Sequence, residues 1–315
     1  MMKKLSVVVS VYNEELALEM FFEETTKILK EMDWDYELIF VNDGSQDGSY
    51  DILKKFAAMS DKVRVVNFSR NFGHEAAMLA GVDYARGDGV VCMDADLQHP
   101  PAYIPKITEA FDSGYSVVNM VRTKNKDAGI IKRITSGAFY KVLNWMSPVK
   151  FENNASDFFA FDAKVMKVMK TEYRERIRFL RGFVQNVGFR RTTIEFEAAK
   201  RVAGESKYSI KKLFKFSIHT LFSFSDLPLK LGVYSGIVTA LFGIILMVYT
   251  IINKVLYHVP AGYSTIIVFL SFMFAVLMVI IGVIGEYISI LFTEIKERPI
   301  YLVDEILGEE KKENE

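Results

Sequence analysis

Two aspartates separated by one residue follow an apolar run in this sequence, in the order Asp94-Ala95-Asp96-Leu97-Gln98. The preceding run, residues 89–93, has the length and composition of a short buried strand. The side-chain oxygens of Asp94, Asp96 and Gln98 suit one hard cation, because Mg²⁺ and Mn²⁺ prefer oxygen ligands. The alternative is that both aspartates cap a helix that begins near Pro101. We favour the metal site, since a carboxylate left uncompensated at a strand end is costly.

The chain up to about residue 122 alternates short β-rich runs with helix-like stretches. This alternation predicts an α/β fold with a mostly parallel, Rossmann-like sheet. We expect strands at residues 5–11, 37–42, 63–68, 89–93 and 115–121. The carboxyl ends of parallel strands share one edge, which is where ligands bind in such sheets. Asp94 and Asp96 are therefore expected at a ligand-binding edge.

Three polar loops are expected at the same edge as the two aspartates. They follow the first three strands and contain Tyr12, Glu14, Asp43, Asn71 and Gly73. The Asp43 carboxylate is suited to accept hydrogen bonds from ribose hydroxyls or a base N–H, and an Asx turn or a helix cap is equally compatible. The sequence lacks a Gly-x-Gly-x-x-Gly motif after the first strand and lacks a P-loop motif. It therefore does not support dinucleotide or P-loop binding.

Four motifs together resemble the family 2 glycosyltransferases, which have the GT-A fold. They are Val9-Ser10-Val11-Tyr12-Asn13-Glu14, Asn42-Asp43-Gly44-Ser45, Ser69-Arg70-Asn71-Phe72-Gly73-His74 and Asp94-Ala95-Asp96-Leu97-Gln98. The chain especially resembles the polyprenyl-phosphate branch, which includes dolichyl-phosphate mannose synthases and bactoprenol glucosyltransferases. The motifs extend to about residue 215, and the apolar segments beyond that point extend the match.

This resemblance implies an inverting transfer of a sugar of the glucose or N-acetylhexosamine type. The donor would be a UDP-sugar and the acceptor polyprenyl (undecaprenyl) phosphate, for modification of a cell-envelope glycan. Asp94, Asp96 and Gln98 would hold Mg²⁺ or Mn²⁺ on the diphosphate, and Asp96 would count among the catalytic groups. The nucleotide sugar would contact residues of the edge loops, namely Tyr12, Glu14, Asp43, Asn71, Gly73 and Asp94.

Two further residues are candidates for the chemistry itself. Asp157 matches the aspartate often assigned as the catalytic base in the family, and it is equally suited to cap a helix starting near Asp162. A phosphomonoester is largely deprotonated at neutral pH, so a positioning role for Asp157 is as well supported as proton abstraction. Arg122 follows the fifth expected strand and is a candidate for contact with phosphate or sugar. The alternative for Arg122 is an exposed surface arginine.

A short basic segment follows these candidates, in the order Arg201-Val202-Ala203-Gly204-Glu205-Ser206-Lys207. Its guanidinium, hydroxyl and ammonium groups suit a phosphate dianion. Arg201, Ser206 and Lys207 also match the family's loop for the acceptor phosphate. The arginines of residues 172–191 are interpreted differently. Arg174, Arg178 and Arg181 have the spacing of residues on one helix face, and a solvated face explains them without a ligand.

Two apolar spans, residues 231–252 and 265–285, contain no charged residue and are long enough to cross a bilayer. We expect a catalytic domain at 1–206, amphipathic membrane-interface helices at 207–230, two transmembrane helices at 231–292 and a C-terminal tail at 293–315. Basic residues lie mainly outside the loop that connects the spans. This distribution predicts a multi-pass protein of the cytoplasmic membrane, with the catalytic domain and both termini in the cytoplasm.

The charge balance, the cysteine count and the absence of one motif argue against several partners and functions. Lysines and arginines total 39, as do aspartates and glutamates, which gives no support for a nucleic-acid partner. The single cysteine, Cys92, excludes an intramolecular disulfide. Two rival functions are a processive polysaccharide synthase, whose Gln-x-x-Arg-Trp motif is absent, and an inert scaffold for a lipid flippase partner. Glycines within the apolar spans favour a homo-oligomer.

Overall fold

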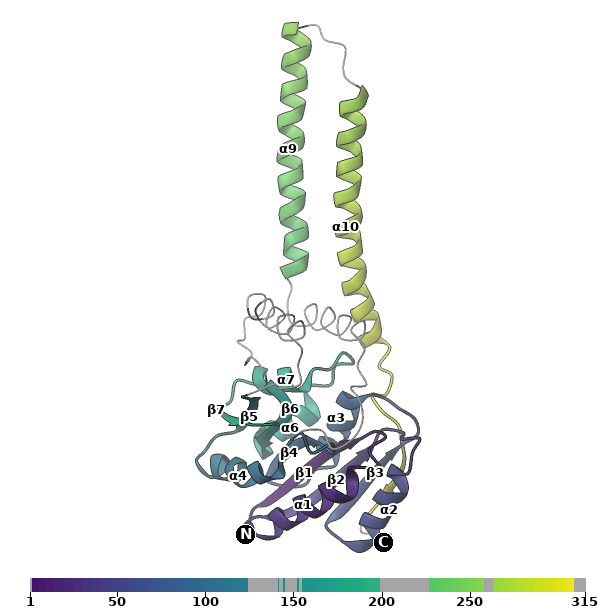
Figure 1. The fold of residues 1–315 in the computed structure, drawn as a ribbon. Helices are drawn as coiled ribbons and strands as arrows, with labels where there is room; N and C mark the ends of the chain where they lie inside the picture. The colour runs from purple at the N-terminus through teal and green to yellow at the C-terminus, as the bar shows by residue number, and fades with distance from the viewer. Residues whose placement is uncertain are drawn as a thin grey trace. The chain divides into compact units, whose positions relative to one another are not determined.

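The computed structural model describes residues 2–123, 141, 144, 152, 155–198, 227–257 and 263–308. The chain divides into two compact units, one comprising Met1–Leu213 with Arg298–Glu315 and the other Phe214–Glu297. The first unit is built around one mixed sheet, and the second contains two long apolar helices (Figure 1).

Eight strands within the described residues form the sheet, in the order β7-β5-β6-β4-β1-β2-β3-β8. Their bounds are β1 Lys4–Val11, β2 Asp35–Asn42, β3 Val63–Phe68, β4 Gly89–Asp94, β5 Val117–Arg122, β6 Ala155–Asp162, β7 Arg191–Phe196 and β8 Val303–Leu307. The pairs β1–β2, β1–β4, β2–β3 and β5–β7 are parallel, whereas β6 and β8 run antiparallel to their neighbours. The expected α/β fold with a mostly parallel sheet is confirmed.

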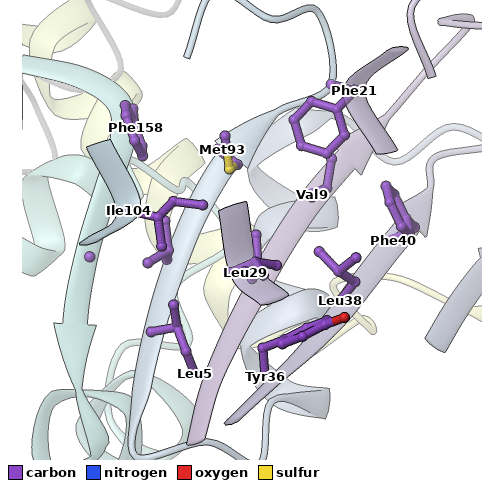
Figure 2. Close-up of a cluster of buried hydrophobic side chains, with 14 of the residues drawn as sticks. Leu5, Val9, Phe21, Leu29, Tyr36, Leu38, Phe40, Met93, Ile104 and Phe158 are labelled. Atoms are coloured by element: carbon purple, nitrogen blue, oxygen red, sulfur yellow. The ribbon is translucent and has the colours of Figure 1, made fainter. Parts of the chain in front are cut away.

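The helices of this unit lie against the sheet, and their apolar side chains contribute to the hydrophobic core. They are α1 Leu18–Lys30, α2 Ser49–Met59, α3 His74–Tyr84, α4 Ile104–Asp112, α6 Ala163–Thr171 and α7 Leu180–Asn186, with a 3₁₀ turn at Pro101–Tyr103. Phe21 and Leu29 of α1 pack with Val9 and Leu38 from the central strands (Figure 2). Burial of these apolar side chains on folding holds the parallel strands in register.

Helix α3 lies on β1, and its middle turns are buried from Ala76 to Val82. An added Cβ at Gly81 would lie only 2.1 Å from Cγ1 of Val8. Glycine therefore permits a close approach of α3 to β1, and this approach sets where His74, the first residue of α3, sits at the edge of the sheet.

Strand β6 was not expected from the sequence. It contains Asp157, so the interpretation of this residue as a helix cap is wrong. The cap of α6 is Asp162, whose Oδ1 accepts the backbone N–H groups of Lys164 and Val165 at 3.0 Å. Asp94 and Asp96 give no side-chain cap to the 3₁₀ turn or to α4, so the interpretation of these two residues as helix caps is also wrong.

Two further segments differ from the sequence-based expectation. Arg174 and Arg178 lie in an irregular segment ahead of α7, so they do not share a helix face with Arg181. Residues 298–308, expected in a C-terminal tail, form β8 and its approach to the sheet. The last residues of the tail, 309–315, lie outside the described residues.

The second unit contains α9 Leu227–Tyr257 and α10 Tyr263–Ile295. Each includes a stretch long and apolar enough to cross a membrane, Leu227–Tyr249 with mean hydropathy 2.2 and Phe272–Ile295 with mean hydropathy 2.4. Almost none of these stretches is buried within the protein. The expected spans thus fall on two helices, while most of the expected interface segment, 207–226, lies outside the described residues.

Candidate active site

The sheet topology brings residues far apart in sequence to one edge. Strands β1 to β4 are parallel neighbours, so the loops that follow them lie at the same edge. Strand β6 is antiparallel to β4 with Cys92 opposite Phe159, and this register continues toward Asp94 and Asp157. Strand β5 is antiparallel to β6 and ends at Arg122. The start of β6 and the end of β5 therefore join the loops of the parallel strands.

Asp94 is the last residue of β4, and its side chain is 29% exposed. Its Oδ1 lies 3.4 Å from the Ser10 hydroxyl and 3.6 Å from Nδ1 of His74. Burial opposes the imidazolium form of His74, but the charges of Asp94 and Asp157 outweigh burial and raise the pKa of the ring. Asp94 therefore has an accessible carboxylate with polar neighbours.

Asp96 lies in the turn after β4 and is only 5% exposed. Its Oδ1 accepts the backbone N–H of Gln98 at 3.1 Å, and Leu97 between them adopts a left-handed conformation with φ of 60°. The described residues include no group of three His, Cys, Asp or Glu side chains that could enclose a metal ion. The donor set of Asp94 and Asp96 nevertheless fits Mg²⁺ or Mn²⁺, because hard cations bound at substrate phosphates take one or two protein carboxylates and complete their shell with other oxygens.

His99 contacts residues at the ends of three strands, β4, β5 and β6, and was not predicted from the sequence. It is fully buried, and its Nδ1 accepts the backbone N–H of Asp94 at 3.0 Å. Its Nε2 lies 2.9 Å from the Ser156 hydroxyl and 3.2 Å from Nη2 of Arg122. Burial lowers the pKa of His99, so the ring is neutral with its proton on Nε2. The sequence feature that could have pointed to His99 is its position directly after Gln98, the last residue of the predicted metal site.

Arg122 is half-buried, which excludes the interpretation of it as an exposed surface arginine. Its Nε is buried and has no hydrogen-bond partner among the residues that the structure describes. A buried guanidinium nitrogen without a partner is costly, and an anionic ligand at this edge would satisfy it.

Asp157 forms an ion pair with Arg181, with 3.3 Å between Oδ1 and Nη1. Burial disfavours the charged carboxylate, but Arg181 and His74 outweigh burial and hold the pKa of Asp157 below its usual range. Asp157 is therefore a carboxylate at neutral pH and a weak base.

Glu75 is a second carboxyl group next to this pair that the sequence analysis missed. Its Oε2 accepts the backbone N–H of Leu180 at 2.8 Å, which connects α3 to the start of α7. Burial and the nearby charge of Asp157 raise the pKa of Glu75 to about 7. The two carboxyl groups at this edge thus have opposite pKa shifts.

Asp43 organises the loop between β3 and α3. Its Oδ1 accepts the backbone N–H of Phe72 at 2.6 Å, and its Oδ2 accepts the N–H of Gly73 at 3.0 Å and the side-chain amide of Asn71 at 2.9 Å. Burial, which outweighs these bonds, raises the pKa of Asp43. An added Cβ at Gly44 would lie 2.6 Å from the backbone of Arg70 and Asn71, so the two loops approach closely only with glycine there.

The loop that contains Tyr12 and Glu14 is attached to the loop after β2. The backbone N–H groups of Asn13 and Glu14 donate to the hydroxyls of Ser45 and Ser49 at 3.0 and 2.9 Å. Asn13 has a φ of 55°, which turns the chain away from β1. Tyr12 and Glu14 are half-buried beside these contacts.

Residues 6–172 match the family described as Glycosyl transferase family 2. The chain belongs to this family. Residues 227–291 match a second family, described as GtrB C-terminal hairpin. The protein is thus a glycosyltransferase with a GT-A fold and an apolar C-terminal helix pair, as the resemblance of the sequence motifs implied.

Several named proteins are similar to this glycosyltransferase over nearly the whole chain. The uncharacterized glycosyltransferase YkcC of Bacillus subtilis (strain 168) is 40% identical over 98% of this chain and 95% of its own length. The bactoprenol glucosyl transferase of Shigella phage SfII is 35% identical over 95% of this chain and 97% of its own length. Among solved structures, residues 1–349 of S. aureus TarS in complex with UDP-GlcNAc show 18% identity, covering 71% of this chain and 67% of that one, with a TM-score of 0.49.

The glycosyltransferase brings most of the predicted site residues to one edge of the sheet. Asp94, Asp157 and Arg122 surround the buried ring of His99, and Asp43, Asn71 and Gly73 form one hydrogen-bonded cluster. The ligands expected for the acceptor phosphate, Arg201, Ser206 and Lys207, lie outside the described residues.

Proposed function

We propose that this glycosyltransferase transfers a glucosyl group from a UDP-sugar to a polyprenyl phosphate, with inversion at the anomeric carbon. The observation that carries the proposal is similarity over 95% of the chain, apolar helix pair included, to proteins named bactoprenol glucosyl transferase. That name describes transfer of glucose to a bactoprenol carrier. The UDP-sugar, the metal and the inversion are the proposal's own additions.

The donor side of the site is proposed to lie over the carboxyl ends of β1 to β4. Asp94 and Asp96, with Gln98 beside them, would hold Mg²⁺ or Mn²⁺, which when bound neutralises charge on the leaving diphosphate. Tyr12, Glu14, Asn71 and Gly73 line the loops that would contact the nucleotide. Asp43 contributes by holding the loop of Asn71 and Gly73 in place.

The acceptor side is proposed to lie near Asp157, Arg122 and the segment with Arg201, Ser206 and Lys207. A phosphate oxygen of the lipid attacks the anomeric carbon, the bond from that carbon to the diphosphate oxygen breaks, and its electron pair leaves with UDP. A phosphomonoester is largely dianionic at neutral pH and needs no base. Asp157, with its lowered pKa, is therefore assigned to positioning, and Arg122 to binding an anionic oxygen.

The two apolar helices support a proposed membrane arrangement. We propose that α9 and α10 cross the cytoplasmic membrane and that the catalytic unit faces the cytoplasm, because basic residues are concentrated outside the connecting loop. Such an anchor would keep the site near the lipid phosphate. A homo-oligomer and a flippase partner remain proposals from the sequence.

The decisive experiment measures UDP release by the full chain in detergent from a panel of UDP-sugars. Each donor is tested with Mg²⁺ or Mn²⁺, with and without undecaprenyl phosphate. We expect release only with UDP-glucose, metal and lipid together, and a loss of at least about 100-fold in Asp96→Asn. Release without lipid would contradict the proposed acceptor. Full turnover by Asp96→Asn would contradict the metal site.

A further inference from the structure

The segment that follows the second apolar helix belongs to the sheet of the catalytic unit. We call residues 298–308 the C-terminal strap. Its strand β8 pairs antiparallel with β3, with Val65 opposite Leu307 and Phe68 opposite Val303. The backbone N–H of Ser69 donates to the carbonyl of Leu302 at 3.1 Å, which extends the pairing one residue into the loop that precedes α3. At Leu302 the strap thus contacts a loop of the candidate active site.

Tyr301 is the main side-chain attachment of the strap at this end. Its ring stacks on that of Phe68, with 5.1 Å between centroids and 12° between planes. Its hydroxyl donates to Oδ2 of Asp83 in α3 at 2.6 Å, and Arg174 holds the same carboxylate at 2.7 Å. Burial and the adjacent Asp83 charge raise the pKa of Tyr301, so the hydroxyl stays protonated and remains a donor.

A continuous set of contacts leads from Tyr301 to the loop that Asp43 holds. Phe68 packs edge-on against Phe72, with 5.6 Å between ring centroids. The backbone N–H of Phe72 donates to Oδ1 of Asp43 at 2.6 Å, and the guanidinium of Arg70 lies 4.0 Å from the Phe72 ring centroid. Loss of the Tyr301 ring would remove the outer support of Phe68 and Phe72.

A second set of contacts leads from β8 to the loop after β2. The side-chain amide of Asn67 donates to Asp304 at 3.4 Å, and Asn42 donates to Oδ1 of Asn67 at 2.7 Å. Oδ1 of Asn42 in turn accepts the backbone N–H of Ser45 at 3.2 Å. Ser45 is the residue whose hydroxyl holds the loop of Asn13. Both donor-side loops are therefore linked to the strap.

We propose that Tyr301 is a positioning residue, and that the C-terminal strap holds the loop of residues 69–73 in the conformation that binds the nucleotide sugar. The proposal rests on the proposed function in one respect, that this loop contacts the donor. The strap follows α10 in the chain but belongs to the catalytic unit, and in this proposal it completes the donor side of the site.

The test compares three variants of the full chain in detergent. Tyr301→Leu removes the ring stack and the hydroxyl, whereas Tyr301→Phe keeps the stack and removes only the bond to Asp83. Tyr50→Phe is the matched control, because the Tyr50 hydroxyl donates to Glu305 of the same strap. Among the described residues, no hydrogen bond or ring stack joins Tyr50 to Phe68 or to residues 69–73. Two quantities are measured, hydrogen exchange of peptides covering residues 69–79 and steady-state kinetics with UDP-glucose.

We expect faster exchange in residues 69–79 for Tyr301→Leu, a KM for UDP-glucose raised about tenfold, and a kcat within about twofold of the wild type. Tyr301→Phe should show a smaller change of both, and Tyr50→Phe none. Exchange that stays at the wild-type rate in Tyr301→Leu and Tyr301→Phe, with only the Tm lowered, would overturn the proposal. If Tyr301→Leu does not fold, the comparison of Tyr301→Phe with Tyr50→Phe decides.

The two readouts separate this proposal from the proposed function. Faster exchange in Tyr301→Leu supports the role of the strap even if the wild type releases no UDP from UDP-glucose, and in that case the proposed donor alone is wrong. Faster exchange together with an unchanged KM in an active enzyme would show that the loop does not position the donor, and the proposal would fail.

Discussion

Oδ1 of Asp157 lies 3.3 Å from Nη1 of Arg181, and this ion pair determines what Asp157 can do. The guanidinium, together with His74, keeps the pKa of Asp157 below its usual range despite burial. A carboxylate with a lowered pKa is a poor proton acceptor and a good charged anchor. The lowered pKa supports the proposed positioning role over the role of general base, because the proposed lipid phosphate acceptor is already deprotonated.

Replacement of Arg181 by glutamine tests this assignment through the pH dependence of kcat/KM. Without the guanidinium, the pKa of Asp157 rises, so Asp157 is protonated at higher pH. We expect the acid limb of the profile to move to higher pH, with a larger loss of activity at pH 6 than at pH 8. Arg181→Lys, which keeps the positive charge, should move the limb less. An identical acid limb in Arg181→Gln would show that the charge of Asp157 does not matter for turnover.

Glu75 makes the stability of the protein depend on pH. Its pKa is about 7 in the folded protein, against 4.5 for an ordinary glutamate. Between these values the folded state binds more protons than the unfolded state, so stability falls as pH rises from about 4.5 to about 7. Glu75→Gln keeps an acceptor for the Leu180 N–H and removes the charge. We expect it to raise stability at pH 8 by on the order of 2 kcal/mol, a Tm increase of roughly 4–8 °C.

The measurement is the Tm of wild type and Glu75→Gln in the same detergent at pH 5 and pH 8. The two proteins should unfold at similar temperatures at pH 5, where Glu75 is protonated when folded. A difference that is the same at both pH values would mean that the carboxyl group is not protonated on folding.

The sequence predicted the parts of the fold that depend on local patterns. The apolar runs that became β1 to β4 are buried on both faces, so hydrophobicity alone reveals them. Strand β6 was missed because its start is polar and its place between β4 and β5 depends on pairing with two distant segments. Strand β8 was missed because it has only five residues and two adjacent acids, Asp304 and Glu305, interrupt its apolar pattern. Its stability depends on pairing with the edge of β3.

In the candidate site too, residues marked by a local sequence pattern were predicted, and residues whose roles depend on distant contacts were not. Asp94 and Asp96 were predicted because a strand end followed by two carboxylates one residue apart is visible in the sequence. His99 and Glu75 were missed because their roles come from contacts with Ser156 and Leu180, which lie far away in the chain. The expected helix face was wrong because residues 173–179 are not helical, and Arg174 instead forms an ion pair with the distant Asp83.

Asp43 is expected to matter for the loop that it holds. In Asp43→Asn, one carboxylate oxygen is replaced by an amide nitrogen that cannot accept the N–H groups of Phe72 or Gly73. The unmade bonds should cost about 1–3 kcal/mol and raise the donor KM roughly tenfold or more. Asp88→Asn is the control, because Asp88 also accepts a backbone N–H, that of Lys4, but at the opposite edge of the sheet.

The readouts for Asp43 are the donor KM and hydrogen exchange of residues 69–79. Asp88→Asn should change neither, although it lowers the Tm slightly. If Asp43→Asn speeds hydrogen exchange of the loop but leaves the donor KM unchanged, the loop does not contribute to donor binding.

His99 contacts Asp94 of the proposed metal-binding segment and Ser156 of β6 through different ring nitrogens, and two variants separate these contacts. In His99→Asn the amide oxygen takes the place of Nδ1 and accepts the backbone N–H of Asp94. In His99→Gln the longer side chain reaches the place of Nε2 and the Ser156 hydroxyl. His99→Leu loses both bonds and leaves the backbone N–H of Asp94 without its acceptor, at about 1–3 kcal/mol, whereas the Ser156 hydroxyl still accepts the backbone N–H of Phe158.

We expect the position of Asp94 to determine the affinity for Mn²⁺ in the presence of UDP. Electron paramagnetic resonance measures this affinity, because its signal reports the concentration of free Mn²⁺. We expect His99→Asn to retain most of the affinity, His99→Gln to lose about tenfold, and His99→Leu to lose at least as much. Equal affinities in His99→Asn and His99→Gln would show that the bond to Asp94 does not orient the metal-binding carboxylates. The Tm of each variant separates this effect from a general loss of stability, because both amide variants retain one of the two bonds.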